Sequence, residues 1–187
     1  MSKIPFNKPG NMLYPVPAVM VSAGNEEKQN IITVAWTGTV CSDPPMVYIS
    51  IRKSRYSYDI ISETGEFVIN LPNESLVHAM DYCGVKSGAK VDKFRECGLT
   101  PAKSLTVGAP SIEEAPVSIE CKVKQIMELG SHDMFLAEIT AVTAEEQFFD
   151  ENNVFHLEHA GLVAYEHGKY RSMGEVLGKF GYSVKKS

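Results

Sequence analysis

The residues of this chain best suited to hold an anion lie in one short segment, residues 50–57. This segment, Ser50-Ile51-Arg52-Lys53-Ser54-Arg55-Tyr56-Ser57, places three cations and three serine hydroxyls within eight residues. An arginine guanidinium matches a pair of phosphate oxygens, and the start of a helix offers N–H groups that have no partner within the helix. A phosphate monoester would use all of these groups together. A solvated basic loop with serine caps is the alternative, and the pattern alone does not decide between them.

A second feature is the segment from Asn30 to Ser42, which holds the only tryptophan of the chain. Trp36, Thr37, Gly38 and Thr39 place an aromatic ring, two hydroxyls and a glycine along one predicted strand. Small residues let the backbone approach a flat ring closely, and N–H groups and hydroxyls can bond to its polar edge. Taken alone, the pattern favours the simpler interpretation, an ordinary barrel strand with a packed tryptophan.

Several common catalytic motifs are absent from the sequence. It contains no G-x-G-x-x-G after a strand, no G-x-x-x-x-G-K-[ST] and no G-x-S-x-G. His156 and His159 are three residues apart, but no P-C-x-x-C follows them, so two histidines in a loop are favoured over a metal site. The sequence offers no catalytic dyad or triad, and we predict neither a catalytic residue nor a metal ligand.

Composition narrows the class of protein. The 187 residues fit a single domain, which we expect to span 1–187. The net charge of −5 argues against a general nucleic-acid binder. No apolar run reaches the roughly 18–20 residues that span a bilayer, and the N-terminus lacks a signal-peptide pattern. We therefore expect a cytoplasmic protein that binds neither nucleic acid nor membrane, with its four cysteines reduced.

The elements that must position these residues are mostly strands. The clearest is Val117–Lys124, where apolar and polar residues alternate as in an antiparallel strand with one solvent-facing side. A turn at residues 130–133 returns the chain along 134–142. Residues 31–40 read as one long strand that ends at a reversal containing Pro44 and Pro45. Further strands are predicted at residues 18–22, 46–51, 67–70 and 162–165, the last of these being the final strand.

Three short helices complete the pattern. The first is capped at Ser54 or Ser57 and runs to about residue 63. The second starts at Asn73 and ends at Gly84, and the third spans residues 92–97. Six or seven antiparallel strands with two or three helices predict a mainly β fold, a closed or half-closed antiparallel barrel of Greek-key type.

Taken together, these segments resemble the flavin reductase-like family, whose members have an FMN-binding split β-barrel. The flavoredoxin branch, which has the tryptophan strand, is the most similar. The resemblance covers nearly the whole chain in the family's order, and no single segment decides it. The segments that carry it are residues 30–39, 42–45, 50–57, 87–94, 98–100, 130–135 and 178–183.

The resemblance implies a set of FMN-binding residues. The ring would lie along Ala35, Trp36, Thr37, Val40, Cys41 and Ser42. The ribityl chain and phosphate would be held by Ser50, Ile51, Arg52, Ser54 and Ser57. Lys90 and Phe94 would border the flavin, from the same subunit or from its partner, since such proteins are usually homodimers with the site at the interface.

The resemblance also implies a redox function. The leading expectation is an NAD(P)H-dependent flavin reductase, in which NADH or NADPH passes a hydride to bound or free flavin and on to an acceptor. One alternative is a flavoredoxin-type electron carrier with tightly bound FMN and a protein redox partner. Another is a non-enzymatic flavin-binding module. Cys41 is interpreted as a packed thiol rather than a redox group, and His132 as either a structural residue of a turn or a nicotinamide contact.

Overall fold

The computed structural model describes residues 1–184, and the elements below are those of this part of the chain. The strands are β1 (Val16–Pro17), β2 (Val19–Gly24), β3 (Gln29–Val34), β4 (Thr37–Ser42), β5 (Pro45–Ile51), β6 (Glu66–Leu71), β7 (Pro101–Ala102), β8 (Ser111–Ile112), β9 (Val117–Glu128), β10 (Asp133–Ala144), β11 (Val163–Glu166) and β12 (Lys169–Ser172). The helices are α1 (Tyr56–Thr64), α2 (Val77–Val85) and α3 (Lys93–Cys97), with 3₁₀ turns η1 (Glu74–Leu76), η2 (Glu146–Phe148), η3 (Leu157–Ala160) and η4 (Tyr182–Val184).

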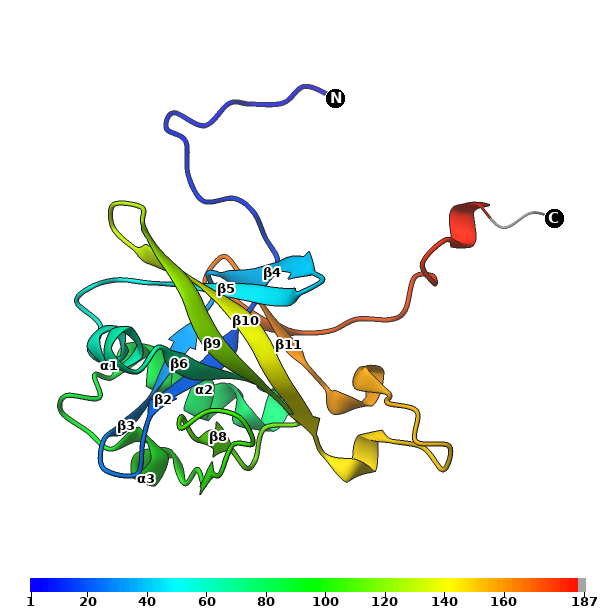
Figure 1. Ribbon diagram of the computed structural model, residues 1–187. Helices are drawn as coiled ribbons and strands as arrows, with labels where there is room; N and C mark the ends of the chain where they lie inside the picture. Colours follow the sequence, from blue (N-terminus) through cyan, green and yellow to red (C-terminus); the bar gives the residue numbers. More distant parts are fainter. Residues whose placement is uncertain (185–187) are drawn as a thin grey trace.

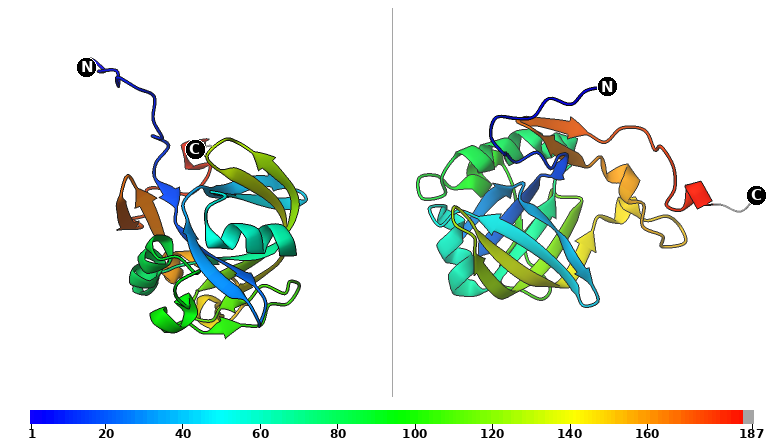
Figure 2. Two further views of the ribbon diagram at one scale, coloured as in Figure 1. Left: turned by 90° about the vertical axis from the view of Figure 1, so that its left-hand side faces the viewer. Right: turned by 90° about the horizontal axis from the view of Figure 1, so that it is seen from above.

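The main sheet curls until its two edges meet. Its seven strands run in the order β3-β2-β6-β9-β10-β5-β4, and every neighbouring pair is antiparallel. The two edge strands, β3 and β4, are consecutive in the chain and separated only by Ala35 and Trp36. The sheet therefore forms a barrel with a split at this step (Figures 1 and 2). The mainly β split barrel with short helices predicted from the sequence is confirmed.

Two cores lie on the two sides of the sheet. The barrel interior is filled by side chains such as Ile49, Phe67 and Phe135, and α1 adds Ile61. The outer core lies between β2 and β3 and the helices α2 and α3. Every residue of β2 is buried because both of its faces are covered. This explains its composition of small and apolar residues.

The predicted long strand over residues 31–40 is wrong. The chain bends at Ala35 and Trp36, which separate β3 from β4. The reason is the closure of the barrel, since these two residues carry the chain from one edge of the sheet to the other. The Trp36 carbonyl accepts a hydrogen bond from the Ser50 N–H at 2.8 Å. This bond joins the bend to β5.

Two other local predictions also need correction. Gly84 does not end the second helix but lies inside α2, which continues to Val85. A Cβ on Gly84 would come within 3.2 Å of the Thr33 side chain, so glycine lets α2 pack closely against β3. Asn73 caps η1, the 3₁₀ turn that leads directly into α2. The strand predicted at residues 162–165 is not the final one, since β11 pairs with β12 after a turn at His167 and Gly168.

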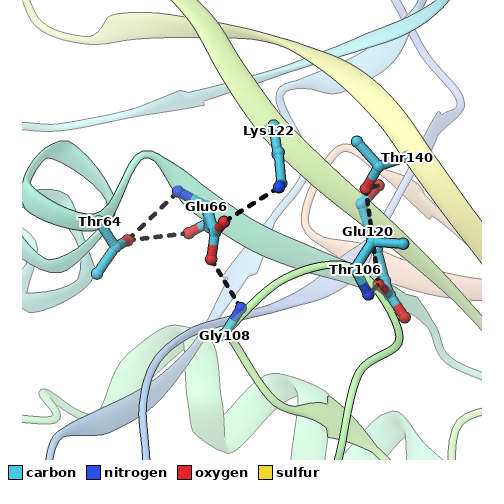
Figure 3. A network of polar contacts seen from close by, with 7 residues as sticks. All are labelled: Thr64, Glu66, Thr106, Gly108, Glu120, Lys122 and Thr140. Atoms are coloured by element: carbon cyan, nitrogen blue, oxygen red, sulfur yellow. Dashed lines mark hydrogen bonds and ion pairs between the residues drawn. The ribbon is translucent and has the colours of Figure 1, made fainter.

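β9 also differs from the prediction in which of its side chains face solvent. Ser118 and Glu120, on the side expected to face solvent, are buried. The loop of residues 103–110 covers Glu120 (Figure 3). Ser118 donates its hydroxyl to the side-chain oxygen of Asn70 at 2.8 Å. Glu120 accepts hydrogen bonds from the N–H groups of Leu105 and Thr106 at 2.7 and 2.6 Å.

Glu66 holds the same loop at a second point. Its carboxylate accepts the N–H of Gly108 at 2.7 Å and lies 3.7 Å from the Lys122 ammonium. We call Glu66 and Glu120 the acidic clasp.

The remaining chain lies outside the barrel. β1, β11 and β12 form a separate three-stranded sheet beside α2. The N-terminal segment before β1 and the C-terminal segment after β12 both extend away from the body (Figures 1 and 2). The prediction of one domain over 1–187 stays a prediction, and its last three residues lie outside the described part.

Candidate functional site

The split of the barrel contains a small hollow of about 140 Å³. One wall is the end of β3 with the bend at Ala35 and Trp36, and the other is the end of β5 with Ser50 and Ile51. Arg52, Arg55 and His132 complete the lining. The two strand ends come together because the two edges of the sheet meet here. The hollow therefore follows from the closure of the barrel.

Two arginines and a helix start make one end of this hollow cationic. Arg52 follows β5 directly, and a turn closed by the Arg55 N–H on the Arg52 carbonyl, at 3.0 Å, leads into α1. Arg55 is the N-cap residue of α1, and within residues 1–184 no side chain caps that helix. The N–H groups of its first turn are thus left for another acceptor. We call Arg52, Arg55 and the first turn of α1 the cationic corner.

The cationic corner is held in place from below. Ser57 is fully buried, and its hydroxyl accepts a hydrogen bond from the Asn30 side chain on β3 at 2.8 Å. Gly88 lies directly against that amide, since a Cβ on Gly88 would fall 2.1 Å from the Asn30 oxygen. Only glycine allows the loop after α2 to approach this closely. Ser57 therefore fixes the start of α1 rather than facing the solvent.

The positive charge of the corner is not neutralised within the described part of the chain. The ion pairs between residues of 1–184 include neither Arg52 nor Arg55. The same positive charge affects His132. Burial and the charges of the two arginines lower the pKa of its imidazole. An excess of positive charge beside free N–H groups is the arrangement that recognises a phosphate.

A second hollow, of about 120 Å³, lies on the other side of Arg55. Ser54, Ser57 and Ser87 supply hydroxyls to its lining, and Lys86 and Lys93 supply ammonium groups. Lys93 is buried, and its ammonium donates to the carbonyls of Ile31 and Cys83 at 2.6 and 2.7 Å. Burial lowers the pKa of this ammonium.

A third hollow, of about 960 Å³, opens on the opposite side of the split. Its wall carries apolar and aromatic side chains, among them Leu13, Trp36, Tyr48 and Met134. It shares Trp36, Ser50, Arg52 and His132 with the first hollow, which in turn shares Arg55 with the second. The three hollows thus follow one another, from a cationic end at α1 to a wide apolar end beside Trp36.

An aromatic cluster supports the wide end. The Tyr14 ring lies 6.3 Å from the Trp36 ring and 5.9 Å from that of Tyr165, measured between centroids. Tyr170 stands next to Tyr165 at 5.8 Å and donates its hydroxyl to Asp81 on α2 at 2.9 Å. Burial, followed by the Asp81 carboxylate, raises the pKa of Tyr170 to about 12. The cluster joins the segment before β1 to the small sheet and to α2.

The structure brings together seven of the residues predicted to bind the cofactor. Ala35, Trp36, Ser50, Ile51 and Arg52 line the first hollow, and Ser54 and Ser57 line the second. Sequence reasoning left out of this predicted set four lining residues of the first two hollows that can carry a positive charge: Arg55, Lys86, Lys93 and His132. Arg55 lies in the basic segment and could have been included on that ground. Lys93 carries no local signal, because only the fold places its ammonium below β3.

The other predicted residues lie elsewhere. Thr37 is buried and donates its hydroxyl to the Tyr48 carbonyl at 2.7 Å. Val40, Cys41 and Ser42 lie at the tip of the β4–β5 hairpin, outside the three hollows.

Lys90 and Phe94 also lie apart from the three hollows. Lys90 lines a separate open hollow beside Tyr56, and Phe94 is packed in the outer core. The roles of these six residues in binding stay predictions.

Two further observations concern ligands and membranes. Within residues 1–184 no group of three or more histidine, cysteine, aspartate or glutamate side chains is arranged to hold a metal ion. Instead, His156 lies between the carboxylates of Asp150 and Glu158, at 3.3 and 3.2 Å, which raise the pKa of its imidazole. No helix of the described chain is long and apolar enough to cross a membrane.

The fold and the site together define the class of protein. The antiparallel barrel, which is split beside a cationic helix start, places this chain among the split-barrel proteins. The chain belongs to the flavin reductase like domain family, whose model matches residues 11–174. The resemblance found in the sequence is thereby confirmed.

Similar proteins include flavoredoxins. The structure matches flavoredoxin of Desulfovibrio vulgaris (Miyazaki F) with a TM-score of 0.90 and 32% identity, covering 99% of this chain and 100% of that one. It matches flavoredoxin from Methanosarcina acetivorans with a TM-score of 0.89 and 29% identity, covering 99% and 100%. The FMN reductase (NADH) RutF of Pseudomonas syringae is 27% identical over 108 residues, 56% of each chain.

Proposed function

We propose that this chain is an FMN-binding oxidoreductase that accepts reducing equivalents from NADH or NADPH. The observation that supports the proposal most directly is the order in which the three hollows follow one another along the split. A cationic end suited to a phosphate leads, past Ser50 and Trp36, to a wide end suited to a flat ring. FMN has these two parts in the same order, with the phosphate at one end and the ring at the other.

The donors of the cationic corner fit a phosphate monoester. Two guanidiniums, those of Arg52 and Arg55, line the first hollow. The second hollow shares Arg55 with it and is lined by Ser54 and by the uncapped start of α1. A dianion would compensate both arginines, whose charges have no carboxylate partner among the described residues.

The chain's own residues bind and orient rather than react. When bound, FMN would supply the hydride and electron chemistry. Arg52 and Arg55 would anchor the phosphate, while Trp36, Tyr48 and Met134 would exclude water around the ring. Thr37 cannot offer its proton to a ligand without breaking its bond to the Tyr48 carbonyl. Because FMN would supply the hydride chemistry, the proposal assigns no general acid or base to the protein.

The test is the visible absorption spectrum of the purified protein, recorded anaerobically before and after NADH or NADPH is added. We expect a bound-flavin spectrum that bleaches quickly with one of the two nicotinamides. A colourless protein that fails to take up added FMN would overturn the proposal.

A second function is favoured by the similarity to the two flavoredoxins. In that case FMN would be a permanent electron relay and the partner would be a redox protein. Tightly bound FMN that stays oxidised with either nicotinamide, but is reduced by a protein donor, would support this function. FMN that stays oxidised with every reductant would instead indicate a non-enzymatic flavin-binding module.

We further propose that the working unit is a homodimer in the cytoplasm. The support is the resemblance to a family whose members are usually dimeric, together with the extended segments at both ends of the described chain. Lys90, at the rim of its separate hollow, would then contact flavin from one of the two subunits.

A further inference from the structure

The C-terminal segment exposes apolar side chains far more than any part of the barrel. We call residues 173–184 the C-terminal arm. It leaves the small sheet after β12 and extends away from the body in Figure 1 and in the right-hand view of Figure 2. Leu177 is 94% exposed and Phe180 109%. The other apolar members of the arm are also more than 60% exposed: Met173, Val176, Tyr182 and Val184.

Such an arm is unfavourable in water. Each apolar side chain left exposed forgoes the favourable free energy that its burial would contribute. Contiguous exposed apolar surface of this kind marks an interaction site. The arm therefore needs a surface that receives it.

A matching surface lies at the root of the arm. An apolar groove of about 830 Å³ runs between β1, η3 and the first residues of the arm. Pro15, Val16, Leu157, Leu162 and Val163 are among its lining residues. Three carboxylates, those of Glu74, Glu158 and Glu175, stand on the same lining. We call this surface the acidic groove.

The part of the arm beyond the groove, residues 177–184, carries the complementary charge, whereas Glu175 lies on the groove lining. Lys179 stands between Leu177 and Phe180, so a cation is flanked by two of the most exposed apolar side chains. Only the first residues of the arm, 173–176, line the groove of their own chain. The following residues lead away from the body in Figure 1 and in the right-hand view of Figure 2.

We infer that two copies of this chain exchange their C-terminal arms, each placing Leu177, Lys179 and Phe180 in the acidic groove of the other. The inference deepens the proposed homodimer by naming its contact surface, and it does not depend on flavin binding. The arm begins at the edge of the groove. A twofold axis beside the first residues of the arm would therefore let each copy place its arm in the groove of the other. Residues 173–179 can reach up to about 25 Å when extended, which suffices to cross into a neighbour.

The exchange would bury an adequate area. Phe180 and Tyr182 on each of two arms would contribute roughly 600–1,000 Å² at about 150–250 Å² per aromatic side chain. The leucine, valines and groove surfaces add to this, which brings the total toward the about 1,600 Å² of a standard interface. A dimer that is stable at micromolar concentration is therefore expected.

The first test is the molar mass of the full chain by light scattering across a concentration series. We expect a dimer, and at least a tenfold weaker dimer for both Phe180→Asp and Leu157→Asp. The matched control is Val142→Asp, which changes an exposed aliphatic side chain on β10 that lines neither the groove nor the hollows described above. A monomeric wild type, or a dimer that neither substitution weakens, would overturn the inference.

The second test needs no substitution. Equal amounts of ¹⁴N- and ¹⁵N-labelled full chain are mixed, allowed to exchange and treated with a carbodiimide, which joins a lysine directly to a carboxylate. We expect peptides that join Lys179 to Glu74 or Glu158 and carry mixed isotopes, because the two residues come from different chains. Links with unmixed isotopes only, or a dimer without links from Lys179, would overturn the inference.

An FMN titration of the same Phe180→Asp protein separates the two proposals. Bound FMN in a weakened dimer supports both of them. A dimer with mixed-isotope links that takes up no FMN would overturn the proposed function and leave the arm exchange supported.

Discussion

Two regions of this molecule bring charged groups together, and they treat them in opposite ways. In the acidic clasp the Glu120 carboxylate is almost fully buried and accepts three hydrogen bonds, two from N–H groups and one from the Thr106 hydroxyl at 2.6 Å (Figure 3). In the cationic corner Arg52 and Arg55 have no carboxylate partner within residues 1–184, and α1 begins without a side-chain cap.

The difference between these two regions distinguishes charges that stabilise the fold from charges that are available to bind a ligand. A charge that the protein satisfies itself holds a loop in place and contributes to folding. A group of charges and N–H donors that the protein leaves unsatisfied contributes little to folding and is available to a ligand. Mutations in the clasp should therefore change stability and leave binding intact, whereas mutations in the corner should do the reverse.

The largest effect is expected from Glu120→Ala. Removing this carboxylate leaves the N–H groups of Leu105 and Thr106 without their acceptor, which should lower the free energy of unfolding by about 2–4 kcal/mol. Urea unfolding followed by circular dichroism measures it. The control is Glu138→Ala, which breaks only the surface ion pair with Lys124 and should cost under about 1 kcal/mol. Equal losses in the two variants would contradict the role of the clasp.

The next effect is expected from Arg52→Ala. Loss of a charged hydrogen bond to the phosphate should weaken FMN binding by about 1–3 kcal/mol, or roughly 5- to 150-fold in Kd. Flavin fluorescence quenching measures the change, and the free energy of unfolding should stay within about 0.5 kcal/mol. The matched control is Arg171→Ala, an arginine paired with Glu166 outside the site. Unchanged FMN affinity would remove Arg52 from the site.

A smaller effect, on the stability of the fold, is expected when the pH is lowered. Burial alone would raise the pKa of Glu120, but the N–H of Leu105 and the N–H and hydroxyl of Thr106 outweigh it and lower the pKa below its ordinary value. The unfolded chain then binds a proton that the folded chain does not. The stability from this group is complete above the ordinary pKa near 4.5 and is lost as the pH falls through the lowered value. Unfolding between pH 6 and 3 should be less pH-dependent in Glu120→Gln, and identical curves would refute this.

The smallest effect is expected at His132. Its pKa is lowered by burial and by Arg52 and Arg55, so its imidazole is neutral at pH 7 in the free protein. A bound phosphate would raise that pKa, so FMN binding would take up a proton, and affinity should increase less than tenfold as the pH falls from 7.5 to 6. The phosphate's own ionisation near pH 6 affects every variant equally. His132→Gln should remove the imidazole contribution, while His78→Gln on α2 should keep it.

The sequence predicted the groups of the cationic corner because they are local. The run from Ser50 to Ser57 contains its own strand end, turn and helix start, so neighbouring residues sufficed to place Arg52 and Ser54. The barrel class followed for a similar reason, since alternation and turn residues are also local signals. The family resemblance added the order of the segments.

What could not be predicted depends on contacts between distant residues. The bend at Ala35 and Trp36 exists because two sheet edges meet, and the strand pattern carries no sign of that closure. The sequence alternation predicts that Glu120 faces solvent, because no local signal shows that the loop near Leu105 covers it. Gly84 reads as a helix end until β3 packs against it. The packing of Phe94 in the outer core also depends on distant contacts, and its predicted place beside the flavin stays a prediction.

The measurement that tests the central claim most directly compares FMN with riboflavin, which differs from it only by the phosphate. Both are titrated into the wild-type chain and into Arg52→Ala. The cationic corner predicts that FMN binds the wild type at least about tenfold more tightly than riboflavin, and that Arg52→Ala removes most of this preference. Equal affinities for the two flavins in the wild type, or no binding of either, would contradict it.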